Sequence, residues 1–272
     1  MKKLFYFFLL PLLFSCGNKS LEKEGTLQTP EQLLKEEEKS NDRHQSAEPF
    51  AVVELFSSEG CSDCPSAEEV LNKITKNAMA DKSYIYPLAF HVDYWNKLGW
   101  KDIFSDSSYS NRQRKYRKAF GSEVVYTPQM IVNGETEFTG SDEKKADSAI
   151  SAMLKKTPEV YFSIHPDDNW TKLDFECYSV PKDFEAKKMK LVFCVAIVER
   201  NLESKINRGE NKGLTLHHQN VVCKFISKEL IELHGTIQLP KLEKPLSKNF
   251  SIIAFVQNTE TMKILGANLW NY

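Results

Sequence analysis

The sequence predicts a mixed α/β domain followed by a mainly antiparallel β-sandwich domain. Three observations predict this order. Apolar strand patterns alternate with amphipathic helical patterns from residue 50 to residue 157. A short turn that carries Cys61 and Cys64 joins the first strand to the first helix. Beyond residue 158, short alternating segments follow one another without a long helical pattern, which is typical of antiparallel sheets.

The composition indicates a soluble globular protein. The chain has 272 residues, of which 41% are hydrophobic and 27% are charged, so it can bury a sizeable core. The formal net charge of -1 gives no basis for binding nucleic acid by bulk electrostatics, and we expect no nucleic-acid partner. The six cysteines are too few and too scattered for a disulfide scaffold.

The N-terminus predicts export. Two lysines precede an apolar run from Leu4 to Phe14, and a small-residue cleavage site ends at Cys16. The run is too short to span a bilayer, so residues 1–15 are predicted to be a signal peptide. Residues 13–16, LFSC, resemble the lipobox of bacterial lipoproteins, in which cleavage leaves an acylated cysteine. We therefore expect a protein of the cell envelope that is anchored to a bacterial membrane through a lipid on Cys16 and faces the periplasm or the exterior.

An ordinary secretory signal with a chance cysteine is the alternative. Either reading places the mature protein outside the cytosol, where disulfides persist. Residues 17–49 contain no Phe, Trp or Tyr and are rich in Glu, Lys, Ser and Gln. Such a segment cannot bury enough surface to fold alone, so residues 16–48 are predicted to be a disordered tether.

The α/β domain is expected over residues 49–157. Its predicted strands are 51–57, 83–92, 129–132 and 136–139, and its predicted helices are 61–78, 105–120 and 142–156. In the first helix, apolar residues recur at helical spacing from Ala67 to Ile74, which leaves Glu68 and Lys73 on the face turned away. The order β, α, β, α, β, β, α, with a long insert after the second strand, is that of a thioredoxin-like domain.

The cysteine pair lies where a strand passes into a helix. Backbone N–H groups and the helix dipole stabilise a thiolate there, which lowers the pKa of the leading cysteine. We therefore expect thiol–disulfide chemistry without a cofactor, in which Cys61 attacks and Cys64 resolves the mixed disulfide. The alternative is a structural disulfide, although so small a loop gains little stability from being closed.

Further residues are expected beside this pair. The first two strands form a βαβ unit, so His91 and Asp93 should lie at the sheet edge that carries Cys61. Thr127-Pro128 precedes a core strand, which favours a cis bond over the trans alternative. In thioredoxin-like proteins this loop faces the cysteines and helps to bind the extended peptide of a substrate. The predicted substrate-binding residues are Thr127, Pro128, His91, Asp93 and Trp95.

The second domain is expected over residues 158–272. Its predicted strands are 160–165, 172–178, 190–198, 213–225, 233–239, 250–257 and 262–269. Cys177, Cys194 and Cys223 lie within these strands and are expected to be buried and reduced, with a bridge from Cys177 to Cys194 left open. His217 and His218 are adjacent, so on a strand they point to opposite faces.

These motifs together resemble one family. VELFSSEGCSDCPSAE, LAFHVDYWNKLGWKD, RQRKY, VYTPQMIVNG, FTGSD, RGENKGLTLHHQNVV and IIAFVQ look like those of the secreted thioredoxin-like family catalogued as domain of unknown function 1223. The resemblance covers about residue 50 to residue 258. It implies a thioredoxin-like fold and a redox-competent pair at Cys61 and Cys64, and it names no partner.

One departure from thioredoxin concerns the proton acceptor. Thioredoxins keep a buried carboxylate on the strand before the cysteines, and Glu54 is the candidate for taking the proton of Cys64. The turn is one residue longer here, and Gly60 stands where an aromatic residue usually precedes the first cysteine.

Three functions stay open at this point. The first is disulfide exchange with an unknown protein thiol or disulfide client. The second is copper binding by Cys61, Cys64 and His91, because soft thiolates suit Cu(I); alternatively, His91 makes a local hydrogen bond to a residue such as Asp93. The third assigns the working role to the second domain as a docking or adhesion sandwich.

Overall fold

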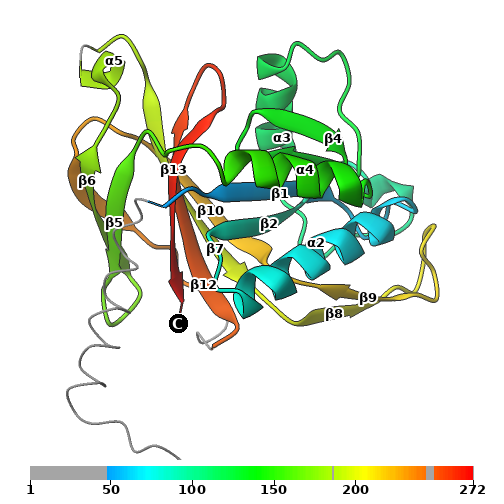
Figure 1. Ribbon diagram of the computed structural model, residues 1–272. Coiled ribbons are helices and arrows are strands. Elements are labelled where there is room, and N and C mark those ends of the chain that lie inside the picture. Colours follow the sequence, from blue (N-terminus) through cyan, green and yellow to red (C-terminus); the bar gives the residue numbers. More distant parts are fainter. Residues whose placement is uncertain (1–47, 186, 243–247, 272) are drawn as a thin grey trace, which may run out of the picture. The chain divides into compact units, whose positions relative to one another are not determined.

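A computed structural model describes residues 48–185, 187–242 and 248–271 (Figure 1). The predicted signal peptide, the lipidation site at Cys16 and the tether as far as residue 47 lie outside the described residues. Among the helices of the described part, none combines the length and the apolar character that a membrane span requires.

The first half contains every predicted element. The elements are β1 (Ala51–Ser57), α2 (Cys64–Ala80), β2 (Ile85–His91), the 3₁₀ turn η2 (Asn96–Leu98), α3 (Ser107–Ala119), β3 (Gln129–Val132), β4 (Thr136–Thr139) and α4 (Glu143–Met153). Helix α2 begins at Cys64 instead of Cys61, since the residues before it form the turn and Pro65 occupies the first helical turn, where a missing N–H is tolerated.

The second half is mostly strands, as predicted. They are β5 (Tyr161–Pro166), β6 (Lys172–Ser179), β7 (Leu191–Glu199), β8 (Leu202–Lys205), β9 (Thr215–His218), β10 (Val221–Glu229), β11 (His234–Gln238), β12 (Phe250–Asn258) and β13 (Ile264–Asn271), with the short helix α5 (Lys182–Glu185). The single strand predicted at 213–225 is two strands, because the backbone turns at Asn220 with a φ of 49°. The pattern did not predict β8 or α5.

Strands from both halves form one eight-stranded sheet. Its order is β13-β12-β7-β10-β2-β1-β3-β4, in which β1 and β2 are parallel and β10 continues the sheet beside β2 (Figure 1). The sequence predicts a separate second domain from residue 158, whereas all described residues lie in one compact unit. The apolar pattern of β2 indicates burial but carries no information about which strand pairs with its free edge.

A sandwich does form within this common fold. Strands β5, β6 and β11 make a three-stranded sheet that packs against β7 and β12 of the large sheet. The ring of Phe193 stacks on Phe175 with centroids 4.2 Å apart and meets Phe162 edge-on at 5.1 Å. The predicted sheet-on-sheet packing is therefore present, although it extends the α/β sheet instead of standing apart from it.

Helices cover both faces of the sheet in the first half (Figure 1). Helices α2 and α4 pack on the face that carries Val53, Leu55 and Ala89, and α3 packs on the face that carries Phe56 and Phe90. Because side chains alternate along a strand, residues one position apart on β1 face different helices.

The three cysteines of the second half are not in disulfides. Cys177 on β6 and Cys194 on β7 are both buried free thiols, so the bridge left open between them does not form. Burial raises the pKa of Cys177 to about 12 and that of Cys194 to about 11. Cys223 is partly buried and also free of a disulfide.

Candidate functional site

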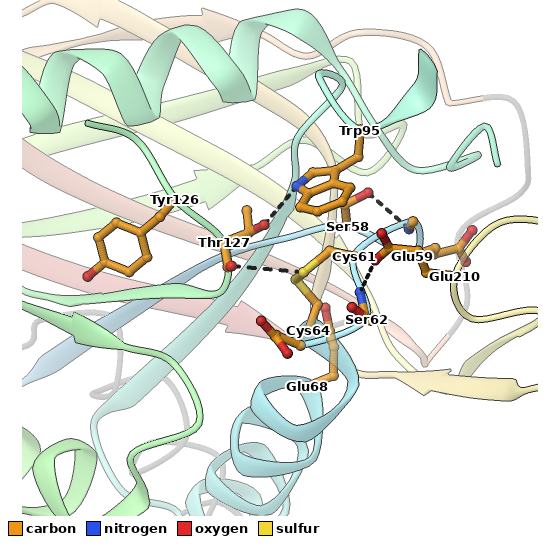
Figure 2. The surroundings of a disulfide bond; sticks show 12 residues. Ser58, Glu59, Cys61, Ser62, Cys64, Glu68, Trp95, Tyr126, Thr127 and Glu210 are labelled. Carbon is orange, nitrogen blue, oxygen red and sulfur yellow. Dashed lines mark hydrogen bonds between the residues drawn. A yellow bond between two sulfur atoms is a disulfide. The ribbon is translucent and has the colours of Figure 1, made fainter. Parts of the chain in front are cut away.

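A disulfide joins Cys61 and Cys64 at the start of α2 (Figure 2). Strand β1 ends at Ser57, and the following turn carries Cys61 and leads to Cys64, the first residue of α2. The Cα atoms of the pair are 5.4 Å apart. Each cysteine is only 1% exposed, so the disulfide lies beneath other parts of the chain.

The loop before β3 lies against the disulfide. The Thr127-Pro128 bond is cis, as predicted, and the Thr127 carbonyl oxygen is 3.9 Å from Cys61 Sγ. Trp95 donates its indole N–H to Thr127 Oγ1 at 2.8 Å. The Trp95 β-carbon also lies only 3.4 Å from where a β-carbon would stand at Gly60. Two predicted substrate-binding residues, Thr127 and Trp95, are thus brought together at the pair (Figure 2), and Pro128 follows Thr127 through the cis bond.

A loop of the second half covers the other side of the cysteine turn. The Asn211 side-chain amide donates to the carbonyl oxygens of Glu59 and Cys61 at 2.8 and 2.9 Å. Gly209 has a φ of 78° and packs against Trp100, where an added β-carbon would meet the Trp100 β-carbon at 3.1 Å. The cysteine turn therefore lies between the Thr127-Pro128 loop and the loop that carries Asn211.

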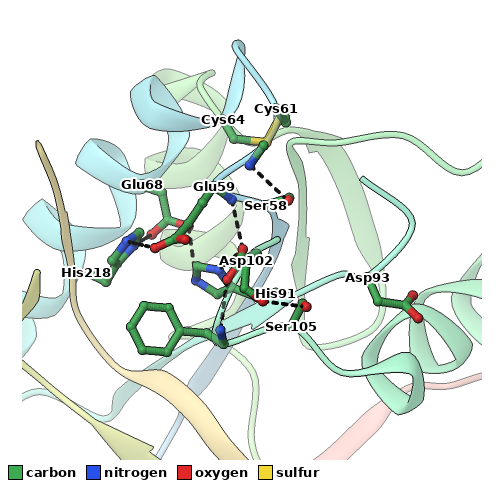
Figure 3. A network of polar contacts seen from close by, with 12 residues as sticks. Ser58, Glu59, Cys61, Cys64, Glu68, His91, Asp93, Asp102, Ser105 and His218 are labelled. Atoms are coloured by element: carbon green, nitrogen blue, oxygen red, sulfur yellow. Dashed lines mark hydrogen bonds and ion pairs between the residues drawn. A yellow bond between two sulfur atoms is a disulfide. The ribbon is translucent and has the colours of Figure 1, made fainter. Parts of the chain in front are cut away.

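A buried network of two histidines and three carboxylates lies behind the disulfide (Figure 3). His91 Nδ1 is 2.7 Å from Asp102 Oδ2, and the same oxygen accepts the Glu59 backbone N–H at 2.8 Å. His91 Nε2 faces Glu68 Oε1 at 3.7 Å.

His218 completes this network from β9. Its Nδ1 is 3.5 Å from Glu68 Oε2, and its Nε2 is 3.3 Å from Glu59 Oε1. The other oxygen of Glu59 accepts the indole N–H of Trp100 at 2.8 Å. Helix α2, the ends of β1 and β2, the insert after β2 and strand β9 each supply part of the network.

Comparison with known proteins identifies the family. The family described as "Protein of unknown function (DUF1223)" matches residues 52–257. The chain belongs to the DUF1223 family.

Two similar proteins support the fold of this DUF1223 chain. A thioredoxin from Methanocaldococcus jannaschii is 29% identical over 104 residues, which is 38% of this chain and 93% of that protein. A crystal structure of a protein from Agrobacterium tumefaciens superposes with a TM-score of 0.63 at 26% identity, covering 84% of this chain and 96% of that one. The α/β core is thioredoxin-like, and the Agrobacterium structure is similar over most of the chain.

In this DUF1223 chain, Glu54 does not face Cys64, as a proton acceptor for that thiol would. Its two oxygens accept hydrogen bonds from Arg112 Nε at 2.6 Å and Nη2 at 2.9 Å, and the Tyr116 hydroxyl donates to the same carboxylate. Since it alternates with Val53 and Leu55 on β1, Glu54 faces α3, whereas the helix that begins at Cys64 covers the other face. The structure thus replaces the predicted role with a buried ion pair.

His91 and Asp93 differ from each other in their surroundings. The two ring nitrogens of His91 face the carboxylates of Asp102 and Glu68. The ring is therefore placed beside Glu68 on α2, and not beside the sulfurs of Cys61 and Cys64 that the copper alternative requires. The predicted local partner Asp93 instead accepts from the Ser110 hydroxyl on α3.

Burial and charge act in opposite directions on the network. Burial alone would lower the pKa of His218, but hydrogen bonds to Glu59 and Glu68 outweigh it and raise that pKa to about 10. Burial would likewise lower the pKa of His91, yet the charge and hydrogen bond of Asp102 raise it. Burial raises the pKa of a carboxyl group, but His218 lowers that of Glu68 and His91 lowers that of Asp102.

The sequence did not identify Glu59, Glu68, Asp102 and His218 as site residues. Glu68 was expected on the exposed face of its helix, but it is 5% exposed because the β8–β9 hairpin packs over α2. The prediction for the adjacent histidines is confirmed: His218 is buried and His217 is exposed. The signals available were the RGENKGLTLHH motif and the spacing of Cys64 and Glu68, one helical turn apart.

Proposed function

We propose that this protein is a thiol–disulfide oxidoreductase of the cell envelope that exchanges disulfides with a protein client through Cys61 and Cys64. The observation that carries this proposal is the disulfide at the N-terminus of α2, against the Thr127-Pro128 loop. The thioredoxin of similar sequence supports it. Trp95 and the main chain around Thr127 offer the client's extended peptide a surface beside the sulfurs.

The exchange proceeds in two steps that conserve electrons. In the reduced protein, the Cys61 thiolate attacks a client disulfide, which forms a mixed disulfide and releases one client thiolate. The Cys64 thiolate then attacks Cys61 Sγ, so the pair becomes oxidised and the client leaves with two thiols. The reverse sequence oxidises the client. Backbone N–H groups at the start of α2 and the helix dipole stabilise the Cys61 thiolate in both directions.

Exchange should fail without Cys61. We expect the Cys61→Ser variant to reduce a disulfide-bonded model peptide no faster than the buffer does, because serine cannot form the mixed disulfide. The Cys64→Ser variant should instead accumulate that mixed disulfide, and in cells it should retain the client for identification. Peptide thiol release and non-reducing electrophoresis measure the two outcomes.

Cys223→Ser is the matched control for this experiment. Cys223 is a partly buried thiol on β10 that contacts Glu199 and Val221, so its loss should leave the exchange rate unchanged. Parent-like exchange by the Cys61→Ser variant would refute the proposed chemistry.

The lipid anchor can be tested separately. We propose that a lipid on Cys16 holds the protein at a bacterial membrane, with residues 16–48 as the spacer. Replacing Cys16 with alanine should move the protein from the membrane fraction to the soluble fraction of lysed cells. Membrane retention of that variant in carbonate-washed membranes would exclude acylation at Cys16 as the anchor.

A further inference from the structure

The histidine–carboxylate network holds buried polar atoms that make no hydrogen bond. Nε2 of His91 and Oε1 of Glu68 face each other at 3.7 Å, and Nε2 of His218 and Oε1 of Glu59 face each other at 3.3 Å, without a hydrogen bond in either pair. All four side chains are at most 7% exposed. A buried polar atom that lacks a partner costs about 1–3 kcal/mol, and more when it is charged. Hydrogen bonds within the network therefore do not account for its burial.

The distances from the Glu68 oxygens to the two rings are longer than charge-assisted hydrogen bonds and close to those between ligands of one ion. A charge-assisted N–H···O bond measures about 2.7–2.9 Å, and the bond between His91 and Asp102 has this length, 2.7 Å. Glu68 is farther from both rings, at 3.7 Å from His91 Nε2 and 3.5 Å from His218 Nδ1. Ligand atoms bonded to an ion at about 2.0–2.2 Å in a tetrahedron lie about 3.3–3.6 Å apart.

The two rings have the orientation of metal ligands. His91 turns Nδ1 to Asp102 and presents Nε2 to Glu68, while His218 turns Nε2 to Glu59 and presents Nδ1 to Glu68 (Figure 3). Histidines that bind a metal usually donate their other N–H to a carboxylate or carbonyl, which fixes the tautomer. Both outer carboxylates are themselves held, Glu59 by the Trp100 indole and Asp102 by the Glu59 backbone N–H.

The charge of the network favours a cation at its centre. Three carboxylates are buried around two imidazoles, so the carboxylates outnumber the rings, and a buried anion is costly unless a cation accompanies it. One ligand atom each from Glu68, His91 and His218 can be chosen so that all three lie within 4.8 Å of one another. Two imidazole nitrogens and one carboxylate form a ligand set typical of Zn²⁺ and other divalent first-row ions.

We propose that Glu68, His91 and His218 bind a divalent transition-metal ion, with Zn²⁺ the best fit, and that Asp102 and Glu59 position the two rings. The ligands are nitrogen and oxygen only, so the site is distinct from a cysteine-based copper site and is compatible with an intact Cys61–Cys64 disulfide. Because its ligands come from α2, β2 and β9, a bound ion ties the β8–β9 hairpin to the α/β core.

Metal titration tests this proposal. The full chain is unfolded and refolded in EDTA with its disulfide oxidised, freed of chelator, and titrated with Zn²⁺. We expect one Zn²⁺ per chain by mass spectrometry of the metal, together with a higher thermal midpoint. Co²⁺ in its place should give the ligand-field bands of a nitrogen–oxygen site, and the same spectrum in the Cys61→Ser/Cys64→Ser variant.

Variants assign the ligands. His218→Gln should abolish stoichiometric binding, and Asp102→Asn should weaken it about 10- to 100-fold. The matched control is His217→Gln, the neighbouring residue on β9 whose side chain is 67% exposed, which should bind as the parent does. Circular dichroism identifies any variant that does not fold. If His218→Gln does not fold, the titrations of the parent and of Asp102→Asn decide whether the metal site exists. No stoichiometric Zn²⁺ or Co²⁺ in the parent, or equal weakening by His217→Gln and His218→Gln, would overturn the proposal.

Discussion

Replacing Arg112 with methionine should lower the free energy of unfolding by about 3–5 kcal/mol. The Arg112 guanidinium is bonded to both oxygens of Glu54, at 2.6 and 2.9 Å, and both side chains are buried. Methionine removes the cation and leaves the Glu54 carboxylate in the core without it. Urea unfolding with linear extrapolation measures the loss.

Aromatic rings add to this cost. The guanidinium carbon lies 4.7 Å from the ring centroid of Phe225 and 5.3 Å from that of Phe255, within the range of cation–π attraction. Burial alone would lower the pKa of Arg112, but the charge of Glu54 outweighs it and raises that pKa, so the side chain stays charged. A neutral replacement therefore loses both the ion pair and the ring contacts.

Arg114 on the same helix is the matched control. It is exposed and donates to Asn111 Oδ1 at 2.8 Å, so Arg114→Met should change stability by less than about 0.5 kcal/mol. The double variant Glu54→Gln/Arg112→Met should be less destabilised than the sum of the single variants, because it no longer buries an unpaired charge. An Arg112→Met loss as small as that of Arg114→Met would show that the pair contributes little.

The hydrophobic pattern predicted the elements well where they are bounded by strong signals. Strands β3 and β4 have the predicted bounds because Asn133-Gly134 marks the turn between them, and Gly134 adopts the positive φ of 66° that this turn needs. Pairing between distant strands was not predictable in the same way. A run such as 83–92 shows that a strand is covered, yet nothing in it shows that β10 lies at its edge.

The sequence predicted those site residues whose positions follow from local rules for turns and neighbouring strands. Cys61 and Cys64 stand in one turn, Pro128 precedes a strand, and His91 ends the strand parallel to β1, so local rules brought them together. Glu68 and His218 are 150 residues apart. The polar pattern of α2 predicts a solvent-exposed face. The β8–β9 hairpin that covers this face is placed by contacts between residues far apart in the sequence, which the pattern does not reveal.

A fragment that ends at residue 157 should not fold by itself. Side chains of the second half cover the core under α3. Phe225 packs against Phe90 with ring centroids 5.4 Å apart, and the Gln257 amide donates to the Tyr116 hydroxyl at 2.9 Å. Removing residues 158–272 also takes β10 from β2. Uncovering about three large apolar side chains costs about 1.5–3 kcal/mol each, which together rivals the roughly 5–15 kcal/mol that stabilises a whole domain.

Residues 48–157 and 48–272, produced as separate proteins, provide the comparison. The longer chain should unfold in urea in one cooperative transition, whereas the shorter chain should show none and little native-like circular dichroism. A cooperative transition in residues 48–157 would establish the independent thioredoxin-like domain that the alternating pattern suggests. Failure of that fragment to fold would mean that the disulfide cannot be separated from the second half, because Asn211 caps its turn and His218 closes the network behind it.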